Sequence, residues 1–160
     1  MSPLSPLSPS SPSSSSSPSS PSSPSSPSSP SSPDRILLSF DIDGTLEVGD
    51  PPGPVTFALV AEAKARGYVI GSASDRTLRE QRAVWQAAGI RVDFTCHKHR
   101  LADSTSQFSC QCMLHIGDTS LDGYYARLAG FEFCDVTDPA ARGRLFTCLG
   151  LALPPSGVFG

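Results

Sequence analysis

From residue 35 onward, short apolar runs alternate with segments of helical periodicity, and this alternation limits the chain to a small set of folds. Each apolar run is short enough to be a buried strand, and in most of the intervening segments apolar residues recur at helical spacing. Strands and helices that alternate in this way form βαβ units, with parallel strands and helices on both faces of the sheet. We therefore predict an α/β fold, a three-layer, doubly wound parallel sheet of about five strands. The expected strands are 36–40, 68–73, 90–94, 113–117 and 131–136.

The segments between these runs carry start and stop signals of helices. Pro54 suits the first turn of a helix that continues through Ala63, and Gly67 is expected to end it. Asp138 before Pro139 is typical of an N-cap with a first-turn proline, so a last helix is expected to about residue 149. Three more helices are expected: the second at 76–88, a weak third at 100–109, and a fourth from about Leu121 to Leu128 that Gly130 ends. The apolar residues at helical spacing in the second and fourth helices, expected on the core side or a helix face, are Leu78, Val84, Trp85, Leu121, Tyr124, Tyr125 and Leu128.

Residues 1–33 differ from the rest of the chain in composition. They hold twenty Ser, ten Pro, two Leu and the first Met, and no charged residue. Such a segment cannot bury an apolar face, so we expect a disordered Ser/Pro-rich tail that serves as a solvated linker or a phosphorylatable Ser-Pro segment. Residues 34–150 are then one domain of ordinary size, and 151–160 a loose C-terminal tail.

Charge and cysteine usage exclude several classes of protein. The longest apolar stretch is below the 18 residues of a transmembrane helix, so we expect no membrane partner. Net charge is −3 with scattered basic residues, which does not indicate a nucleic-acid binder. The five cysteines form no CxxC pair, so we expect a reducing, cytoplasmic location. Organelle targeting through the Ser-rich N-terminus is the alternative.

Polar side chains follow the expected strands at the points where these end. Asp41, Asp43 and Thr45 come after the first strand, and Asp118 and Asp122 after the fourth. In a doubly wound sheet, ligands bind beyond the carboxyl ends of the strands, so we expect these side chains to gather at one edge. Neighbouring carboxylates repel one another unless a cation or a proton lies between them. The candidate metal ligands are Asp41, Asp43, Asp118 and Asp122.

Oxygen ligands of this kind suit Mg²⁺ better than zinc, and Mg²⁺ in proteins commonly meets substrate phosphate. A carboxylate can also be the nucleophile of phosphoryl transfer and form an aspartyl-phosphate. The reaction then needs donors for the phosphoryl oxygens and a second carboxyl group that protonates the leaving alcohol. Ser72 or Ser74, Lys98 and the pair Asp41 and Asp43 supply these groups.

These residues resemble the motifs of the haloacid dehalogenase (HAD) superfamily of hydrolases. Its first motif, DxDGT after a strand, is present at 41–45, and its fourth, GDxxxD, at 117–122. Its second motif, a Ser or Thr that ends the second strand, lies within 71–76, and its third, a lysine before the fourth strand, is best matched by Lys98. The first and fourth motifs are specific, and the resemblance covers residues 35–137.

The resemblance implies a role for each matched residue. Asp41 would be the nucleophile, Asp43 the general acid and base, and Lys98 the cation that neutralises Asp41, with Arg100 as its substitute. Asp41, the Asp43 backbone carbonyl and Asp118 would hold Mg²⁺, and Asp122 would support the metal through water or orient the lysine. For the second motif the resemblance favours Ser74, with Ser72 as the runner-up. Substrate-binding candidates are Gly44, Thr45 and Ser72.

The resemblance also implies a hydrolase of phosphomonoesters without a cap domain. The segments 46–53 and 95–111, where relatives carry caps, are too short to hold one. An open site suits a phosphorylated substrate that is itself a macromolecule, or a lid from a second subunit, so the sequence is compatible with monomer or dimer. Two non-enzymatic alternatives are a phosphoacceptor module of the receiver type and a degenerate, binding-only HAD domain. Of the histidines, His97 and His99 are expected in surface or structural roles and His115 in the core.

Overall fold

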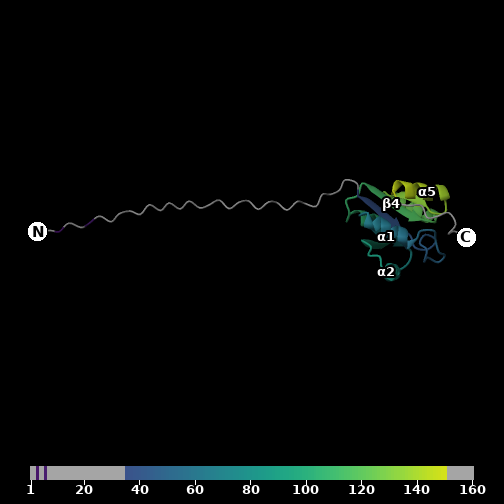
Figure 1. The fold of residues 1–160 in the computed structure, drawn as a ribbon, viewed down its shortest axis with the longest axis horizontal. Coiled ribbons are helices and arrows are strands. Elements are labelled where there is room, and N and C mark those ends of the chain that lie inside the picture. The colour runs from purple at the N-terminus through teal and green to yellow at the C-terminus, as the bar shows by residue number, and fades with distance from the viewer. Residues whose placement is uncertain (1–2, 4–5, 7–34, 151–160) are drawn as a thin grey trace. The chain divides into compact units, whose positions relative to one another are not determined.

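A computed structural model describes residues 35–150, without the side chain of Cys148, and also Pro3 and Pro6. The predicted tails at 1–33 and 151–160 otherwise lie outside the described residues. Within 35–150 one five-stranded parallel sheet has the order β3-β2-β1-β4-β5. Figure 1 shows helices packed beside its strands. The strands are β1 (Ile36–Phe40), β2 (Val69–Ser74), β3 (Phe94–His97), β4 (Cys112–Gly117) and β5 (Glu132–Asp135). The helices are α1 (Phe57–Ala65), α2 (Leu78–Ala87), the 3-10 turn η1 (Lys98–Arg100), α3 (Leu101–Thr105), α4 (Ser120–Leu128) and α5 (Pro139–Cys148).

The sheet is buried between two apolar clusters, which makes the three predicted layers. Successive residues of β1 point to opposite faces, with Leu38 and Phe40 in one cluster and Leu37 in the other. The first cluster includes residues of α1, α2 and α5, and the second includes residues of α3 and α4. Helices thus cover both faces of a parallel sheet, and the predicted fold class is confirmed.

Strand β3 begins four residues later than predicted. The prediction placed it at 90–94, where Ile90 and Val92 only pack against the rim of the first cluster. The β2–β3 ladder begins instead with Gly71 opposite Phe94. A Cβ atom on Gly71 would lie 2.3 Å from the Phe94 ring, so the glycine makes room for that ring. The shift puts Lys98 directly after the strand.

Helix α1 also begins later than predicted. Pro54 precedes the helix, because Val55 forms a parallel bridge with Leu46 before the helix starts. Thr56 is the N-cap, and its hydroxyl accepts a hydrogen bond from Leu59 N at 3.3 Å. By contrast, Asp138 caps α5 as predicted, with Oδ1 2.9 Å from Ala140 N.

Helix α4 presents a different face to the sheet than its apolar residues predicted. Leu121, Tyr124 and Leu128 are exposed, and the buried residues of the helix are Asp122, Gly123 and Ala126. A Cβ on Gly123 would lie 3.0 Å from the Phe133 ring, so the small residues allow a close approach to β5. This rotation turns Asp122 toward the carboxyl end of the sheet. In α2, Trp85 is buried as predicted, whereas Leu78 and Val84 are half-buried.

The segments 46–53 and 95–111, which are too short for a cap, contain no further domain within the described residues. Between β1 and α1 the chain makes turns and the single bridge of Leu46 with Val55. Between β3 and β4 it forms only η1 and α3. Across 35–150, every helix is too short or too polar to cross a membrane.

Candidate active site

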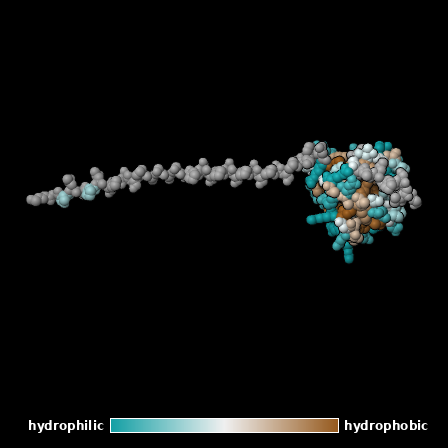
Figure 2. All heavy atoms as spheres, in the orientation of Figure 1, coloured by the Kyte–Doolittle hydropathy of each residue, from teal (hydrophilic) through white to brown (hydrophobic). Residues whose placement is uncertain are grey.

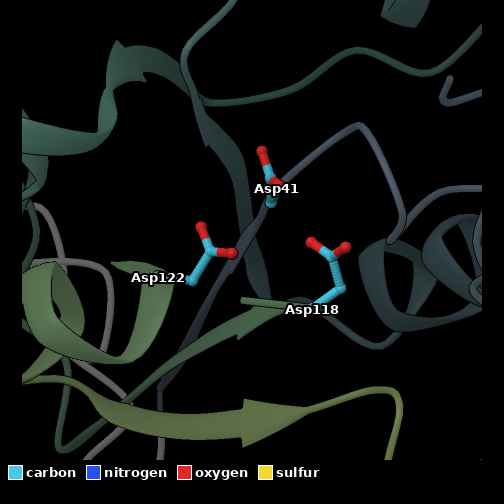
Figure 3. Close-up of side chains that lie close together, drawn as sticks. All are labelled: Asp41, Asp118 and Asp122. Carbon is cyan, nitrogen blue, oxygen red and sulfur yellow. The ribbon is translucent and has the colours of Figure 1, made fainter. Parts of the chain in front are cut away.

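Three carboxylates meet at the carboxyl edge of the sheet. Asp41 follows β1, and its backbone N–H donates to Ile116 O of β4 at 2.8 Å, which fixes the ends of the two central strands side by side. Asp118 follows β4, and Asp122 lies in the first turn of α4. One oxygen of each carboxylate lies within 4.8 Å of an oxygen of the other two. Figure 3 shows the three side chains directed into one common space.

The Asp41 carboxylate is buried in an environment that disfavours its charged form. It is 2 % exposed, and its Oδ1 has no hydrogen-bond partner. Burial, reinforced by the charge of Asp122, raises the pKa of Asp41 to about 6. Burial and Asp122 also raise the pKa of Asp118, whose Oδ1 is likewise buried without a partner. The Oδ1 atoms of Asp41 and Asp118 are therefore both desolvated without a hydrogen-bond partner.

Lys98 neutralises part of this negative charge. Its ammonium lies 2.8 Å from Asp122 Oδ1 and 3.2 Å from both Asp41 Oδ2 and Asp75 Oδ2. Burial alone would lower the pKa of Lys98, but the hydrogen bond to Asp122 and the charge of Asp41 outweigh it and raise the pKa. The lysine is therefore held in its charged form. Arg100, the alternative, pairs with Asp103 at the surface.

Asp122 is fully buried and has a partner for each oxygen. Its Oδ2 accepts from Thr119 N at 3.1 Å and from Thr119 Oγ1 at 2.6 Å, which completes a capping box at the start of α4. Its Oδ1 takes the lysine and faces His115 Nε2 at 3.5 Å. Burial would raise the pKa of Asp122, but hydrogen bonds from His115, Lys98 and Thr119 lower it. Of the two predicted roles of Asp122, these contacts favour orienting the lysine.

The donor set fits a hard divalent cation. The unpartnered Oδ1 atoms of Asp41 and Asp118 are two oxygens that a cation would satisfy, and Mg²⁺ needs only one or two carboxylates because it keeps several waters. Gly44 has φ +71°, and a Cβ on it would lie 2.0 Å from Asp118 Oδ2. The glycine of the DxDGT motif therefore leaves the space that the Asp118 carboxylate occupies.

Asp43 is held away from the other carboxylates. Arg76 Nε lies 2.9 Å from Asp43 Oδ2 and Nη2 lies 2.5 Å from Oδ1, a bidentate pair, and Asp50 N donates to Oδ1 at 2.7 Å. The hydrogen bonds from Arg76 lower the pKa of Asp43. Since the side chain is occupied in this way, a metal contact of Asp43 is left to its backbone carbonyl.

The structure separates the two candidate serines. Ser72 is fully buried, donates to Gln81 Oε1 at 2.7 Å and accepts from Trp85 Nε1 at 3.0 Å, so its hydroxyl serves the core. Ser74 ends β2 and lines the same cavity as Asp41. Of the two candidates, Ser74 lines the cavity beside Asp41, whereas Ser72 is not among its lining residues.

The backbone N–H groups of Gly44 and Thr45 are used within the turn, and the Thr45 hydroxyl is buried without a hydrogen-bond partner. Gly44 N donates to Pro51 O at 2.7 Å and Thr45 N to Ile42 O at 3.3 Å, within the turn after β1. The Thr45 side chain is fully buried. Both residues shape the turn that carries Asp43. Neither is among the residues that line the cavity, so their predicted role in substrate binding stays a prediction.

The cavity beside Asp41 has a volume of about 270 Å³. It is large enough for a phosphoryl group with its waters, and it is lined by groups from three strand ends and the turn after β1. Its lining residues are Asp41, Asp43, Pro51, Ser74, Asp75, Lys98, Asp118 and Thr119.

Three residues that contact the site were not predicted from the sequence as site residues: Asp75, Arg76 and His115. Asp75 and Arg76 directly follow Ser74, so the same rule of polar residues at a strand end would have included them. His115 was predicted in the core, and its Nδ1 lies 3.0 Å from Ser39 Oγ. Ser39 and His115 are register partners in β1 and β4, but only the strand register reveals that His115 lies behind Asp122. His97 and His99 stack on each other at 5.6 Å, beside the lysine.

No protein-family model, curated protein or solved structure matches this chain.

Proposed function

We propose that this protein is a Mg²⁺-dependent hydrolase of phosphomonoesters that works through an aspartyl-phosphate on Asp41. The observation that supports it best is the state of the Asp41 carboxylate. Lys98 holds one oxygen, and the other is buried, unpartnered and beside a cavity of phosphoryl size. A desolvated carboxylate that leaves Oδ1 for a cation keeps Oδ2, beside Lys98, for attack on phosphorus.

The metal would be held by Asp41 and Asp118, with the backbone carbonyl of Asp43 as the third protein ligand. When bound, Mg²⁺ would offset the negative charge of the carboxylates and of the substrate phosphate. The chain's own contribution is to fix the two carboxylates before the metal binds, through the β1–β4 pairing and the space left by Gly44.

In the first step, an Asp41 oxygen forms a bond to phosphorus while the bond from phosphorus to the alcohol oxygen breaks. Lys98 and Ser74 are placed to stabilise the charge on the equatorial phosphoryl oxygens. Asp43, in its protonated form, gives its proton to the departing alkoxide, for which its carboxyl group must turn from Arg76 toward the leaving oxygen.

In the second step, Asp43 takes a proton from a water molecule, whose oxygen attacks phosphorus. The bond between phosphorus and Asp41 breaks, so inorganic phosphate leaves and the Asp41 carboxylate returns. Asp43 is then protonated again and ready for the next ester. The net reaction consumes one ester and one water and yields one alcohol and one phosphate.

The test is hydrolysis of an aryl phosphate by the full chain with Mg²⁺, compared with excess EDTA. Asp41→Asn should abolish turnover, because an amide is not a nucleophile toward phosphorus. Asp103→Asn, which alters an exposed carboxylate paired with Arg100, is the matched control and should stay within about twofold of the parent. Full activity in EDTA, or in the Asp41 variant, would refute the proposal.

An acid quench followed by mass spectrometry of the Asp41 peptide distinguishes the alternatives. A hydrolase should show phosphorylated Asp41 only while substrate is being consumed. A phosphoacceptor module would keep the phosphoryl group after the donor is removed, and a binding-only domain would show none.

A further inference from the structure

A second, larger hollow is lined in part by Arg76, which pairs with Asp43 of the cavity that holds Asp41. It has a volume of about 610 Å³, and we call it the apolar trough. Figure 2 shows apolar, brown atoms at the surface in the region where Figure 1 places α1 and α2, next to polar, teal side chains. The trough is lined by Val48, Phe57, Ala83, Val84 and Ala87, with Arg76 and Glu80 at its polar end and Ala88 beyond Ala87.

Helix α2 forms one wall of the trough. Glu80, Val84 and Ala87 lie on one face of this helix, because residues three or four apart are neighbours on a helix surface. From Glu80 to Ala87 the wall runs about 11 Å, two helical turns. Ala83 and Ala87 are exposed, so these apolar side chains are not part of the hydrophobic core.

The opposite wall is held firmly in place. Phe57 is half-buried, and its ring packs edge-on against Trp85 with centroids 5.8 Å apart. Val48, in the turn segment after β1, is 48 % exposed. The backbone N–H of Phe57 donates to Glu47 Oε1 at 2.6 Å, which ties this turn segment to the start of α1. The trough is therefore a formed surface with an aromatic ring in a fixed orientation.

Arg76 joins the trough to the site. It lines the trough, and its guanidinium holds the Asp43 carboxylate. The acid that protonates a leaving oxygen must lie within hydrogen-bond reach of that oxygen. A leaving alcohol whose oxygen lies beside Asp43 has the apolar trough within reach on the side of Arg76, which contacts both.

We infer that the trough binds the alcohol part of the substrate, and that this alcohol is an unbranched apolar chain or an aryl group rather than a sugar. The inference rests on the proposed function, because it takes Asp43 as the acid. Hydroxyl groups of a sugar would lose water against these walls without gaining partners, whereas methylene groups gain from burial. The planar guanidinium of Arg76 can stack on an aryl ring at the entrance.

The test uses primary alkyl phosphates, whose leaving alcohols have similar acidity, so that differences report binding. For the full chain with Mg²⁺, kcat/KM should rise about two- to fourfold for each methylene from ethyl to hexyl phosphate. Glucose 6-phosphate should stay near ethyl phosphate. Affinities of ethyl-, butyl- and hexylphosphonate, measured by calorimetry, give a reading that does not depend on turnover.

Ala87→Asp places a charge on the trough wall, and Gln86→Asp places the same charge next to it on α2, outside the trough lining. The first should remove the dependence on chain length in both measurements, and the second should preserve it along with the activity. Matching melting temperatures of the two variants would exclude a folding defect as the cause.

The outcomes separate the two proposals. Phosphonate affinity that is independent of chain length overturns the trough assignment, even if all the phosphates are hydrolysed. Affinity that rises with chain length and falls in the Ala87 variant, without any hydrolysis, supports the trough and overturns the proposed catalysis.

Discussion

Lys98 Nζ lies 2.8 Å from Asp122 Oδ1, in a buried ion pair that joins the end of β3 to the start of α4. The same ammonium is 3.2 Å from Asp41 Oδ2, so one cation serves both the candidate nucleophile and the carboxylate behind it. The side chains of Lys98 and Asp122 are 6 % and 0 % exposed. Solvent therefore screens this interaction very little.

Lys98→Met should lower the free energy of unfolding by about 3–5 kcal/mol at pH 7.5, since it leaves a buried carboxylate uncompensated. Adding Asp122→Asn to this variant should recover part of the loss, because the uncompensated charge is then removed. Urea denaturation of the two single variants and the double variant measures the coupling. Arg100→Met, which breaks an exposed pair, should cost less than about 1 kcal/mol. Strictly additive losses in the double variant would show that the pair is not coupled.

Asp41→Asn should stabilise the metal-free protein at neutral pH. The pKa of Asp41 is raised from 3.8 to about 6 on folding, so the folded chain binds this proton more tightly than the unfolded chain. Stability from this group is therefore lost as pH rises from about 4 to 6, and the loss corresponds to about 3 kcal/mol.

Urea denaturation in EDTA at pH 4 and pH 7.5 tests this sign. The variant should be the more stable protein at pH 7.5 and nearly equal to the parent at pH 4. Added Mg²⁺ should stabilise the parent and not the variant. A variant that is less stable than the parent by the same amount at both pH values would contradict the burial argument.

Arg76→Met should shift the pH dependence of catalysis upward. Arg76 lowers the pKa of Asp43, so the acid form of Asp43 is lost at a lower pH than in an ordinary carboxyl group. Removing the guanidinium raises that pKa, and the alkaline limb of kcat for an alkyl phosphate should move to higher pH. Arg82→Met, an exposed arginine of α2, is the control. A limb that stays in place while KM rises would assign Arg76 to substrate binding alone.

Gly44→Ala should remove Mg²⁺ binding, whereas Gly67→Ala should not. Both glycines have positive φ, +71° and +89°, so both substitutions carry strain of about 1–2 kcal/mol. Only at Gly44 does the new Cβ collide with Asp118, because nothing lies within 4 Å of a Cβ on Gly67. The measurement is the increase in melting temperature on adding Mg²⁺, and an equal increase in both variants would contradict the predicted collision.

Ser72→Ala and Ser74→Ala should separate stability from activity. The first leaves Gln81 Oε1 and Trp85 Nε1 buried without their partner, at a cost of about 1–3 kcal/mol, while activity per folded molecule is kept. The second should lower kcat with little change in stability, because Ser74 faces the cavity. Thermal denaturation measures the stability of both variants, and steady-state kinetics measures their kcat. A loss of kcat in Ser72→Ala and not in Ser74→Ala would assign the second motif to Ser72.

The sequence predicted the elements whose signals are local. The buried runs of β1 and β4, with motifs after them, came out within one residue of their bounds. Strand β3 did not, because its start depends on Gly71 accepting the Phe94 ring from a neighbouring strand. The orientation of α4 also depends on a distant partner, the close approach of Gly123 to Phe133, which outweighs the exposure of Leu121 and Tyr124.

The same distinction holds at the candidate site. Asp41, Asp118, Ser74 and Lys98 could be placed from the rule that ligands bind beyond the carboxyl ends of parallel strands. The rule does not predict that Asp43 pairs with Arg76, or that Asp122 contacts both Lys98 and Thr119. These contacts depend on side-chain directions, which residue spacing does not determine.

The capping box of α4 has a consequence for how this protein can change during evolution. The carboxylate of Asp122 both closes the first turn of the helix with Thr119 and holds the lysine beside the nucleophile. A replacement by Ala at this N3 position would remove both the acceptor of the Thr119 hydrogen bonds and the partner of the lysine. Helix initiation and placement of the cation are thus inherited together, and neither can drift without the other.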